Sequence, residues 1–290
     1  MVASPRARTL LDACLISLMP QSAMLDAELV VARSAEREDL DEIRAAYPSV
    51  RFVACPRGAT IPHLRAAGMA AASGDILALT EDHCIAAPNW LEQIVHAQQA
   101  GYDVVGGAMH NAQRQRAVDW AAYFSEYGFF AESGGTGPGD RPLLTGANVV
   151  YSRAVAEDVM ALSHAGEWEN VTHDHLLERG KSLHFVPTAA VLQNQNYRFF
   201  SFCRDRYEHG LDYARRRVTG ESVLRRWTYF AGSLLLPFLL TARVARASGR
   251  QWPWAFARAL PLTFAFFGAW SLGEAAGYWR GPVRSQDVYA

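Results

Sequence analysis

Three consecutive polar side chains follow a short apolar segment. Glu81, Asp82 and His83 come directly after Asp75–Thr80 (DILALT), which has the composition of a buried strand. Carboxylates bind hard divalent cations, and imidazole suits Mn²⁺ better than Mg²⁺. Placed at the end of a strand, these side chains could form a binding or catalytic site. In an arbitrary loop they would be an ordinary surface cluster.

Strand and helix patterns alternate over the first 110 residues. This alternation is typical of a doubly wound, mostly parallel sheet with helices on both faces, an α/β fold. In such sheets ligands bind at the carboxyl ends of the strands, which is where Glu81 would lie. The expected strands are Glu28–Ala32, Val50–Ala54, Asp75–Thr80, Asp103–Gly106, Leu143–Val150 and Ser182–Gln193, and the expected helices are Thr9–Met19, Asp39–Tyr47, Ile61–Ala72 and Asn89–Ala100.

Composition narrows the class of partner. The 28 lysine and arginine residues nearly balance 29 aspartate and glutamate residues, giving a net charge of −1, which argues against a nucleic acid partner. The four cysteines form no CxxC pair, and Met1–Arg8 leads into an amphipathic pattern rather than an apolar signal core. We therefore expect a reduced, cytosolic compartment.

The stretch Pro56–Leu91 (PRGATIPHLRAAGMAAASGDILALTEDHCIAAPNWL) carries a more specific pattern. It resembles the family 2 glycosyltransferases of GT-A fold, which have an arginine, a small-residue helix, an A-x-G-D turn, an apolar strand, an acidic Asp-x-Asp and then P-x-W-L. The resemblance extends through most of residues 1–215 and implies a nucleotide-sugar donor. The matching residues are Arg65, Gly68, Ala72, Gly74, Asp75, Pro88, Trp90 and Leu91.

The family's two metal-binding aspartates fall on Glu81 and His83. The resemblance therefore implies Mn²⁺ or Mg²⁺ held by Glu81 and His83, with Asp82 as an alternative ligand. Such a cation would neutralise the departing nucleoside diphosphate. Because histidine suits Mg²⁺ poorly, the pair favours manganese.

The resemblance also implies a set of donor-binding residues. Arg65 should point at the pyrophosphate or base, and Arg33 replaces the aspartate that usually binds the nucleoside. A solvated helix arginine is the alternative for Arg65. The full set is Pro5, Arg33, Ser34, Arg65, Asp82, Asn148, Arg204 and Arg206.

Inverting transfer needs a base that removes the proton of the acceptor hydroxyl. Counting back from Gly180 by the family's spacing assigns this base to Glu169, with Asp174, Glu167 or a neighbouring histidine as alternatives. Glu169 could instead be a charge at a helix start, favoured by the helix dipole.

A glycine-rich stretch, Ala131–Arg141 (AESGGTGPGDR), interrupts the α/β pattern. It indicates either a surface loop or a lid that closes over bound substrate.

The C-terminal part has a different character. Arg204–Arg284 contains thirteen arginines, five acidic residues and five of the eight tryptophans. Its apolar stretches Trp227–Ala242 and Ala259–Gly273 are shorter than a bilayer span of about 20 residues, and each contains a proline. We expect a GT-A catalytic domain over residues 1–214 and an interfacial, membrane-associating segment over residues 215–290. The alternative is that these helices pack on the domain or form a homo-oligomer contact.

Together these features predict a bacterial-type glycosyltransferase at the cytoplasmic face of the membrane, acting on a lipid-linked or glycan acceptor. A catalytically degenerate GT-A membrane scaffold is the non-enzymatic alternative, because several motif positions are altered. A nucleotidyltransferase is a further alternative, although the chain lacks the glycine-rich phosphate loop that such enzymes carry near the N-terminus.

Overall fold

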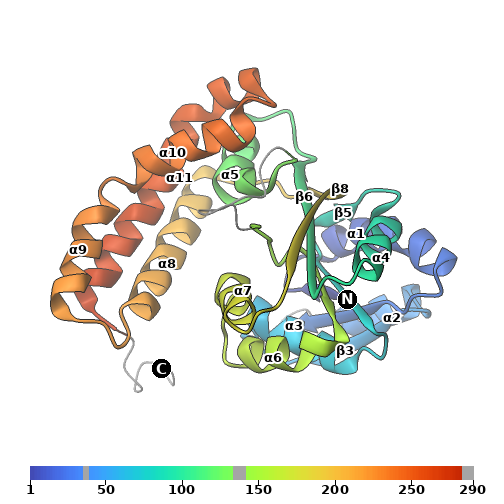
Figure 1. Cartoon of the computed structure of the whole chain (residues 1–290). Coiled ribbons are helices and arrows are strands. Elements are labelled where there is room, and N and C mark those ends of the chain that lie inside the picture. The colour runs from blue at the N-terminus through green and yellow to red at the C-terminus, as the bar shows by residue number, and fades with distance from the viewer. Residues whose placement is uncertain (35–38, 133–141, 283–290) are drawn as a thin grey trace. The chain divides into compact units, whose positions relative to one another are not determined.

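The structure, a computed structural model, describes residues 1–34, 39–132 and 142–282. The glycine-rich stretch predicted as a loop or lid lies mostly outside the described residues. The chain forms two compact units (Figure 1). The first comprises residues 1–112 and 130–195, and the second comprises residues 113–129 and 196–290.

The first unit is built on one eight-stranded sheet in the order β3-β2-β1-β4-β7-β6-β8-β5. Strands β3, β2, β1 and β4 are parallel neighbours, as are β6 and β8, whereas β7 and β5 run antiparallel to their neighbours. The strands are β1 (Val2–Ser4), β2 (Val30–Ser34), β3 (Arg51–Cys55), β4 (Ile76–Glu81), β5 (Cys84–Ala86), β6 (Val104–Asn111), β7 (Asn148–Ser152) and β8 (Leu183–Gln193).

Helices cover both faces of this sheet (Figure 1). On one face, the apolar residues of β4, β6 and β7 share a buried cluster with side chains from α3, α6 and α7. On the other face, α1 packs on β5, and α4 packs on β6 and β8. The helices of this unit are α1 (Arg8–Met24), α2 (Leu40–Ala46), α3 (Ile61–Ala71), α4 (Trp90–Gln99), α6 (Arg153–His164) and α7 (Glu169–Glu178).

The predicted doubly wound α/β fold is confirmed, with a mixed sheet. Strand β7 begins at Asn148, later than the predicted Leu143, because Thr145–Ala147 form a turn in which Asn148 N donates to Thr145 O at 3.0 Å. The chain leaves β6 and enters β7 at the same edge of the sheet, so β7 runs antiparallel to β6.

The Asn148 side chain joins three segments beneath the sheet edge. Its Nδ2 donates to Ala108 O (3.0 Å) and Ala189 O (2.8 Å), and Trp90 Nε1 donates to its Oδ1 (2.8 Å). The β6–β8 register shifts between Gly107 and Met109, and a Cβ on Gly107 would lie 1.7 Å from Ala189 O. The Asn148 hydrogen bonds and the glycine at position 107 thus stabilise this shift of register between β6 and β8.

The second unit is helical. It contains α5 (Ala117–Glu126), α8 (Phe199–Arg217), α9 (Val223–Ser233), α10 (Leu236–Val244) and α11 (Pro253–Arg280). The contacts place α8 in the same unit as the C-terminal helices. The predicted boundary after residue 214 separates a catalytic part from a membrane-associating part and stays a prediction.

Glycines bring α8 and α11 unusually close. A Cβ on Gly210 would lie 2.3 Å from Trp270 O, and one on Gly273 would lie 2.1 Å from Tyr207 O. Between these helices, Trp270 Nε1 and Tyr278 OH donate to the buried Glu274 carboxylate at 2.5 and 2.8 Å. The contact is therefore a packed interface that excludes larger side chains.

Helix α11 continues through Pro261, so the apolar stretch Ala259–Gly273 is part of a longer helix. It is long and apolar enough to cross a membrane by length and composition, with a mean hydropathy of 1.3. The pair Val223–Ser233 and Leu236–Gly249, bent by 60°, passes the same test only when taken together. Pro237 lies at the start of α10, where a missing N–H costs no helical hydrogen bond.

Candidate active site

The candidate site lies where β1, β2 and β4 end. These parallel neighbours place Ser4, Arg33 and Glu81 at one edge of the sheet, and the first residue of α7, Glu169, joins them. These residues lie at the carboxyl ends of the strands, where the sequence predicts the site, and their functional role stays a prediction.

Arg65 on α3 connects the predicted base to the acidic strand end. Its Nη1 lies 2.9 Å from Glu169 Oε2, and its Nη2 lies 2.9 Å from Glu81 Oε1. A Cβ on Gly146 would come within 2.3 Å of the guanidinium, so glycine at this position makes room for Arg65. Arg65 is therefore a buried link, not the solvated helix charge weighed as its alternative.

This arrangement keeps both carboxylates ionised. Burial alone would raise the pKa of Glu81, but positive charge, first that of Arg6, outweighs burial and lowers the pKa to about 2. Burial likewise opposes ionisation of Glu169, and Arg65 nevertheless holds the pKa of this carboxyl below its ordinary value.

Arg6, in the loop after β1, lies against the acidic pair. Its Nη1 is 3.0 Å from Glu81 Oε2 and 3.1 Å from Asp82 Oδ1, and its backbone N donates to Asp82 Oδ2 at 2.7 Å. Ser4 Oγ donates to the same Asp82 oxygen at 3.1 Å. Two carboxylates therefore converge on one cationic nitrogen.

His83 is buried beside this pair, with Nδ1 3.5 Å from Glu81 Oε2. Burial, with a contribution from Arg6, lowers the pKa of His83 to about 3. The imidazole is therefore neutral at physiological pH, which is the form that binds metals.

Arg33, at the end of β2, is bonded within the protein. Its Nε and Nη2 donate to the two oxygens of Asp39 at 2.9 and 2.7 Å, and its Nη1 donates to Ser4 Oγ at 2.7 Å. Arg33 is buried, whereas its partner Asp39 is partly exposed. The pair lowers the pKa of Asp39 through these hydrogen bonds.

The remaining predicted residues take different positions. Pro5 and Ser34 lie at the ends of β1 and β2, next to Ser4 and Arg33. Asn148 is fully buried and bonded to the backbone and Trp90, and Asp174 is exposed on α7. Among the candidates for the base, Glu169 contacts Arg65.

Arg204 and Arg206 lie on α8 in the second unit. Arg206 is buried, with Nη2 3.2 Å from Glu126 Oε1 and its guanidinium over the Phe202 ring. Arg204 is exposed and lies near Glu208 on the same helix. Their donor-binding role stays a prediction.

The sequence analysis missed Arg6 and Asp39. Arg6 follows strand β1 at the carboxyl edge, so its position after Ser4 and Pro5 was the available signal. Asp39 was assigned only to the start of a surface helix, and its pairing with Arg33 needs the folded geometry.

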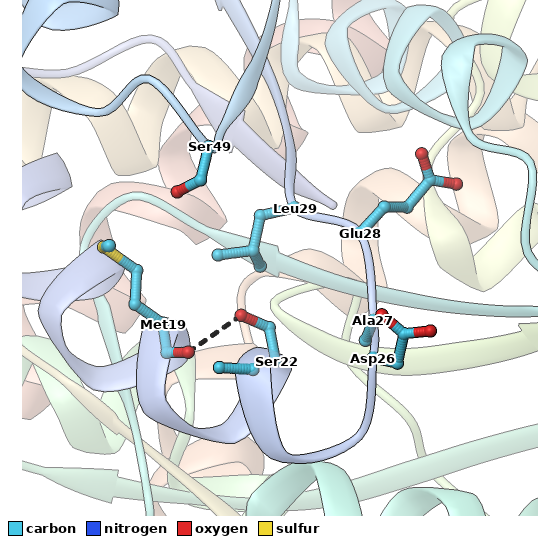
Figure 2. A pocket seen from close by; sticks show the side chains of 8 residues that line it. Met19, Ser22, Asp26, Ala27, Glu28, Leu29 and Ser49 are labelled. Carbon is cyan, nitrogen blue, oxygen red and sulfur yellow. Dashed lines mark hydrogen bonds between the residues drawn. The ribbon is translucent and has the colours of Figure 1, made fainter.

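A hollow of about 230 Å³ lies at the opposite, amino-terminal edge of the strands (Figure 2). It is lined by the end of α1, by Asp26–Leu29 and by Ser49, and Ser22 Oγ donates to Met19 O beside it. None of the predicted site residues lines this hollow.

Glu81, Asp82 and His83 are the side chains that could hold a divalent cation at this site. Glu81 Oε2 and Asp82 Oδ1 converge on a single positive point, and neutral His83 lies beside Glu81. Among the described residues, however, no group of three or more His, Cys, Asp or Glu side chains is arranged to hold a metal. The pair fits a cation whose other ligands come from phosphate or water, provided that Arg6 moves.

A mixed sheet of this order, with acidic side chains ending β4 and helices on both faces, is a GT-A-type fold. The sequence model of glycosyl transferase family 2 matches residues 6–160. This match covers more than half of the chain, and the chain belongs to that family. No curated protein sequence matches the chain.

One solved structure supports this fold. A mannosyltransferase from Pyrobaculum calidifontis, in complex with GDP-Man and Mn²⁺, has a TM-score of 0.54 at 14% identity, over 94% of this chain and 86% of that one. At this identity the likeness shows the fold alone. The inositol-1-phosphate CTP transferase from T. maritima has a TM-score of 0.43 at 12% identity, over 63% of this chain and 74% of that one.

Proposed function

We propose that the chain transfers a hexose or related sugar, with inversion, from a nucleotide-diphosphate sugar to a hydroxyl or phosphate acceptor at a membrane surface. The observation that carries this proposal is the Glu81–Arg65–Glu169 link, with both distances at 2.9 Å. This link supports the proposal, because one guanidinium holds the carboxylates of both the candidate base and the candidate diphosphate site. Family membership supports glycosyl transfer as the reaction.

Glu169 acts as the base in this mechanism. Its side chain is 21% exposed, so an acceptor can approach it, while Arg65 holds one carboxylate oxygen. Removing the acceptor proton as the oxygen attacks the anomeric carbon avoids a positively charged intermediate. Arg65 orients Glu169 and keeps it ionised before the proton arrives.

The donor's diphosphate would lie near Glu81 and Asp82, with Pro5 and Ser34 bordering the nucleoside. Mn²⁺ or Mg²⁺ held by Glu81 with His83 or Asp82 would supply positive charge to the leaving diphosphate. Arg33 anchors Asp39 and Ser4 around this position and thereby shapes the donor site.

The acceptor is lipid-linked or membrane-proximal in this proposal, because the second unit exposes apolar side chains beside arginines. Leu235, Phe238 and Leu239 are 60%, 64% and 60% exposed, and Arg225, Arg243 and Arg246 lie on the same helical stretch. Apolar insertion and attraction to anionic lipids would together hold this unit at a cytoplasmic membrane face.

Thermal unfolding of the full chain with UDP-, GDP- and dTDP-sugars, each with and without Mn²⁺, tests the proposal. A ligand that binds only the native state raises the melting temperature, so the true donor should stand out. That donor should then release nucleoside diphosphate, even by slow hydrolysis. Binding without any turnover would favour the scaffold alternative, and no binding of any donor would contradict the proposed function.

A further inference from the structure

Arg6 occupies the point at which the two acidic side chains meet. Its loop is short, since β1 ends at Ser4 and α1 begins at Arg8. One nitrogen, Nη1, is within 3.1 Å of oxygens from both Glu81 and Asp82. A guanidinium nitrogen so placed takes the position that a bridging cation would take.

A metal ion cannot share this position with Arg6. Carboxylate oxygens bind Mg²⁺ at about 2.1 Å and larger divalent cations somewhat farther away, so an ion bound to both oxygens on the side that Nη1 occupies would overlap it. The two positive charges would also repel each other strongly at such a distance. Occupancy by Arg6 and by a metal are therefore mutually exclusive.

Of the two arginines that contact Glu81, Arg6 is the more exposed. Arg65 is buried on α3 and bonded to a second carboxylate, Glu169. The Arg6 side chain is 24% exposed and belongs to a loop. Glu81 thus has one permanent cationic neighbour and one that can exchange.

We propose that Arg6 is an internal cation that holds Glu81 and Asp82 in the ligand-free protein and gives way when a divalent cation arrives with a nucleoside diphosphate. The released guanidinium then pairs with phosphate oxygens, which Arg side chains bind well. The phosphate step rests on the proposed function, whereas the exclusion between Arg6 and the metal does not. The exchange makes metal and diphosphate bind together and makes metal alone bind weakly.

Titration of the nucleotide-free full chain with Mn²⁺, followed by the electron paramagnetic resonance signal of free Mn²⁺, tests the exclusion without any measurement of activity. We expect Arg6→Gln to bind Mn²⁺ at least about ten-fold more tightly than wild type, because a competing charge has been removed. Arg8→Gln is the matched control. Arg8 lies two residues away and carries the same charge, but its Nη1 contacts Glu42 at 3.0 Å.

Equal Mn²⁺ affinity in wild type and folded Arg6→Gln would overturn the proposal, as would an equal gain in Arg8→Gln, which would reveal a general charge effect. A second measurement requires no folded variant. In wild type, UDP or GDP should tighten Mn²⁺ binding, and Mn²⁺ should tighten diphosphate binding by the same factor. Independent binding of the two would overturn the exchange. If Arg6→Gln gains Mn²⁺ affinity but no nucleotide binds, the exclusion stands and the proposed function fails.

Discussion

Arg65 Nη1 lies 2.9 Å from Glu169 Oε2, and this ion pair joins the first residue of α7 to the helix that precedes the acidic strand. The two residues are 104 positions apart in the chain. Because the same guanidinium also binds Glu81, a substitution that displaces Arg65 should disturb both carboxylates. The site is therefore best probed by paired substitutions.

Glu169→Gln should lower turnover by about 10²- to 10⁴-fold while donor affinity stays near normal. Glutamine keeps the shape and can still accept a hydrogen bond from Arg65, but it cannot take up the acceptor proton. Steady-state kinetics and calorimetry with the identified donor measure the two effects. Asp174→Asn, on the exposed side of α7, is the control and should be nearly silent. The reverse pattern would move the base to Asp174.

Gly146→Ala should disturb the site through Arg65. The new Cβ would fall within 2.3 Å of the guanidinium, so Arg65 must shift away from Glu169 or Glu81. We expect catalytic efficiency to fall by at least about ten-fold and stability to fall by about 1–3 kcal/mol. Gly74→Ala is the matched control, since its Cβ would meet only Ile76 O at an ordinary 3.8 Å. Similar behaviour of the two variants would show that Arg65 does not depend on this space.

The contribution of the Glu81 ion pairs to the free energy of unfolding should decrease at acid pH. The folded pKa of about 2 lies below the ordinary 4.5, so the unfolded chain takes up the proton first. The stabilisation is complete above about pH 4.5 and is lost as the pH falls towards 2. The stability difference between wild type and Glu81→Gln, measured by urea unfolding, should therefore narrow from pH 5 to pH 3. A stability difference that stays constant over this pH range would contradict the assignment.

Two glycines of α11 should respond in opposite directions to alanine. At Gly273 the Cβ would lie 2.1 Å from Tyr207 O, so Gly273→Ala should destabilise the helical unit by about 1–3 kcal/mol. At Gly268 nothing lies within 4 Å, so Gly268→Ala should stabilise by up to about 1 kcal/mol through helix propensity. Calorimetric unfolding of the full chain measures both. Equal effects would mean that α8 and α11 do not pack as described.

Membrane attachment should depend on the exposed side chains of α10 and its start. Replacing Leu235, Phe238 and Leu239 by serine should weaken sedimentation with phosphatidylserine vesicles by at least about ten-fold, because each inserted side chain contributes on the order of 1 kcal/mol. Ile16→Ser with Met24→Ser is the control, since both are exposed on α1 in the first unit.

High salt should also release the protein, because its arginines contribute through attraction to anionic lipid. If wild type stays in the supernatant at low salt, the membrane proposal fails. These helices would then belong to a dimer contact or to a purely protein interface.

The sequence predicted the elements of the first unit well, because its apolar runs and helical stripes are regular. It placed Arg65, Glu81 and Glu169 near one another through the motif spacing. It could not show that Arg6 bridges Glu81 and Asp82, since that contact depends on the loop after β1. The direction of β7 also escaped, because periodicity reports a strand but not its orientation.

The sequence also could not predict which side chains of α11 pack against a neighbouring helix. Within the segment predicted to associate with a membrane, Phe266 packs on Phe199 and Phe202 of α8, and Trp270 bonds to Glu274. Phe264, Leu272 and Trp279 are the large exposed apolar residues along this part of the helix. A nearly uniform apolar stretch does not reveal which of its faces meets a neighbour.

The hydrogen bonds of the Asn148 side chain bear on the unfolding rate of the protein. Its three partners, Trp90, Ala108 and Ala189, are 58, 40 and 41 residues away. Contacts that close such long loops form late, after the strands and α4 have docked. Interactions absent from the folding transition state leave the folding rate nearly unchanged and slow unfolding instead. We therefore expect the Asn148 amide to slow the opening of the sheet more than it changes the folding rate.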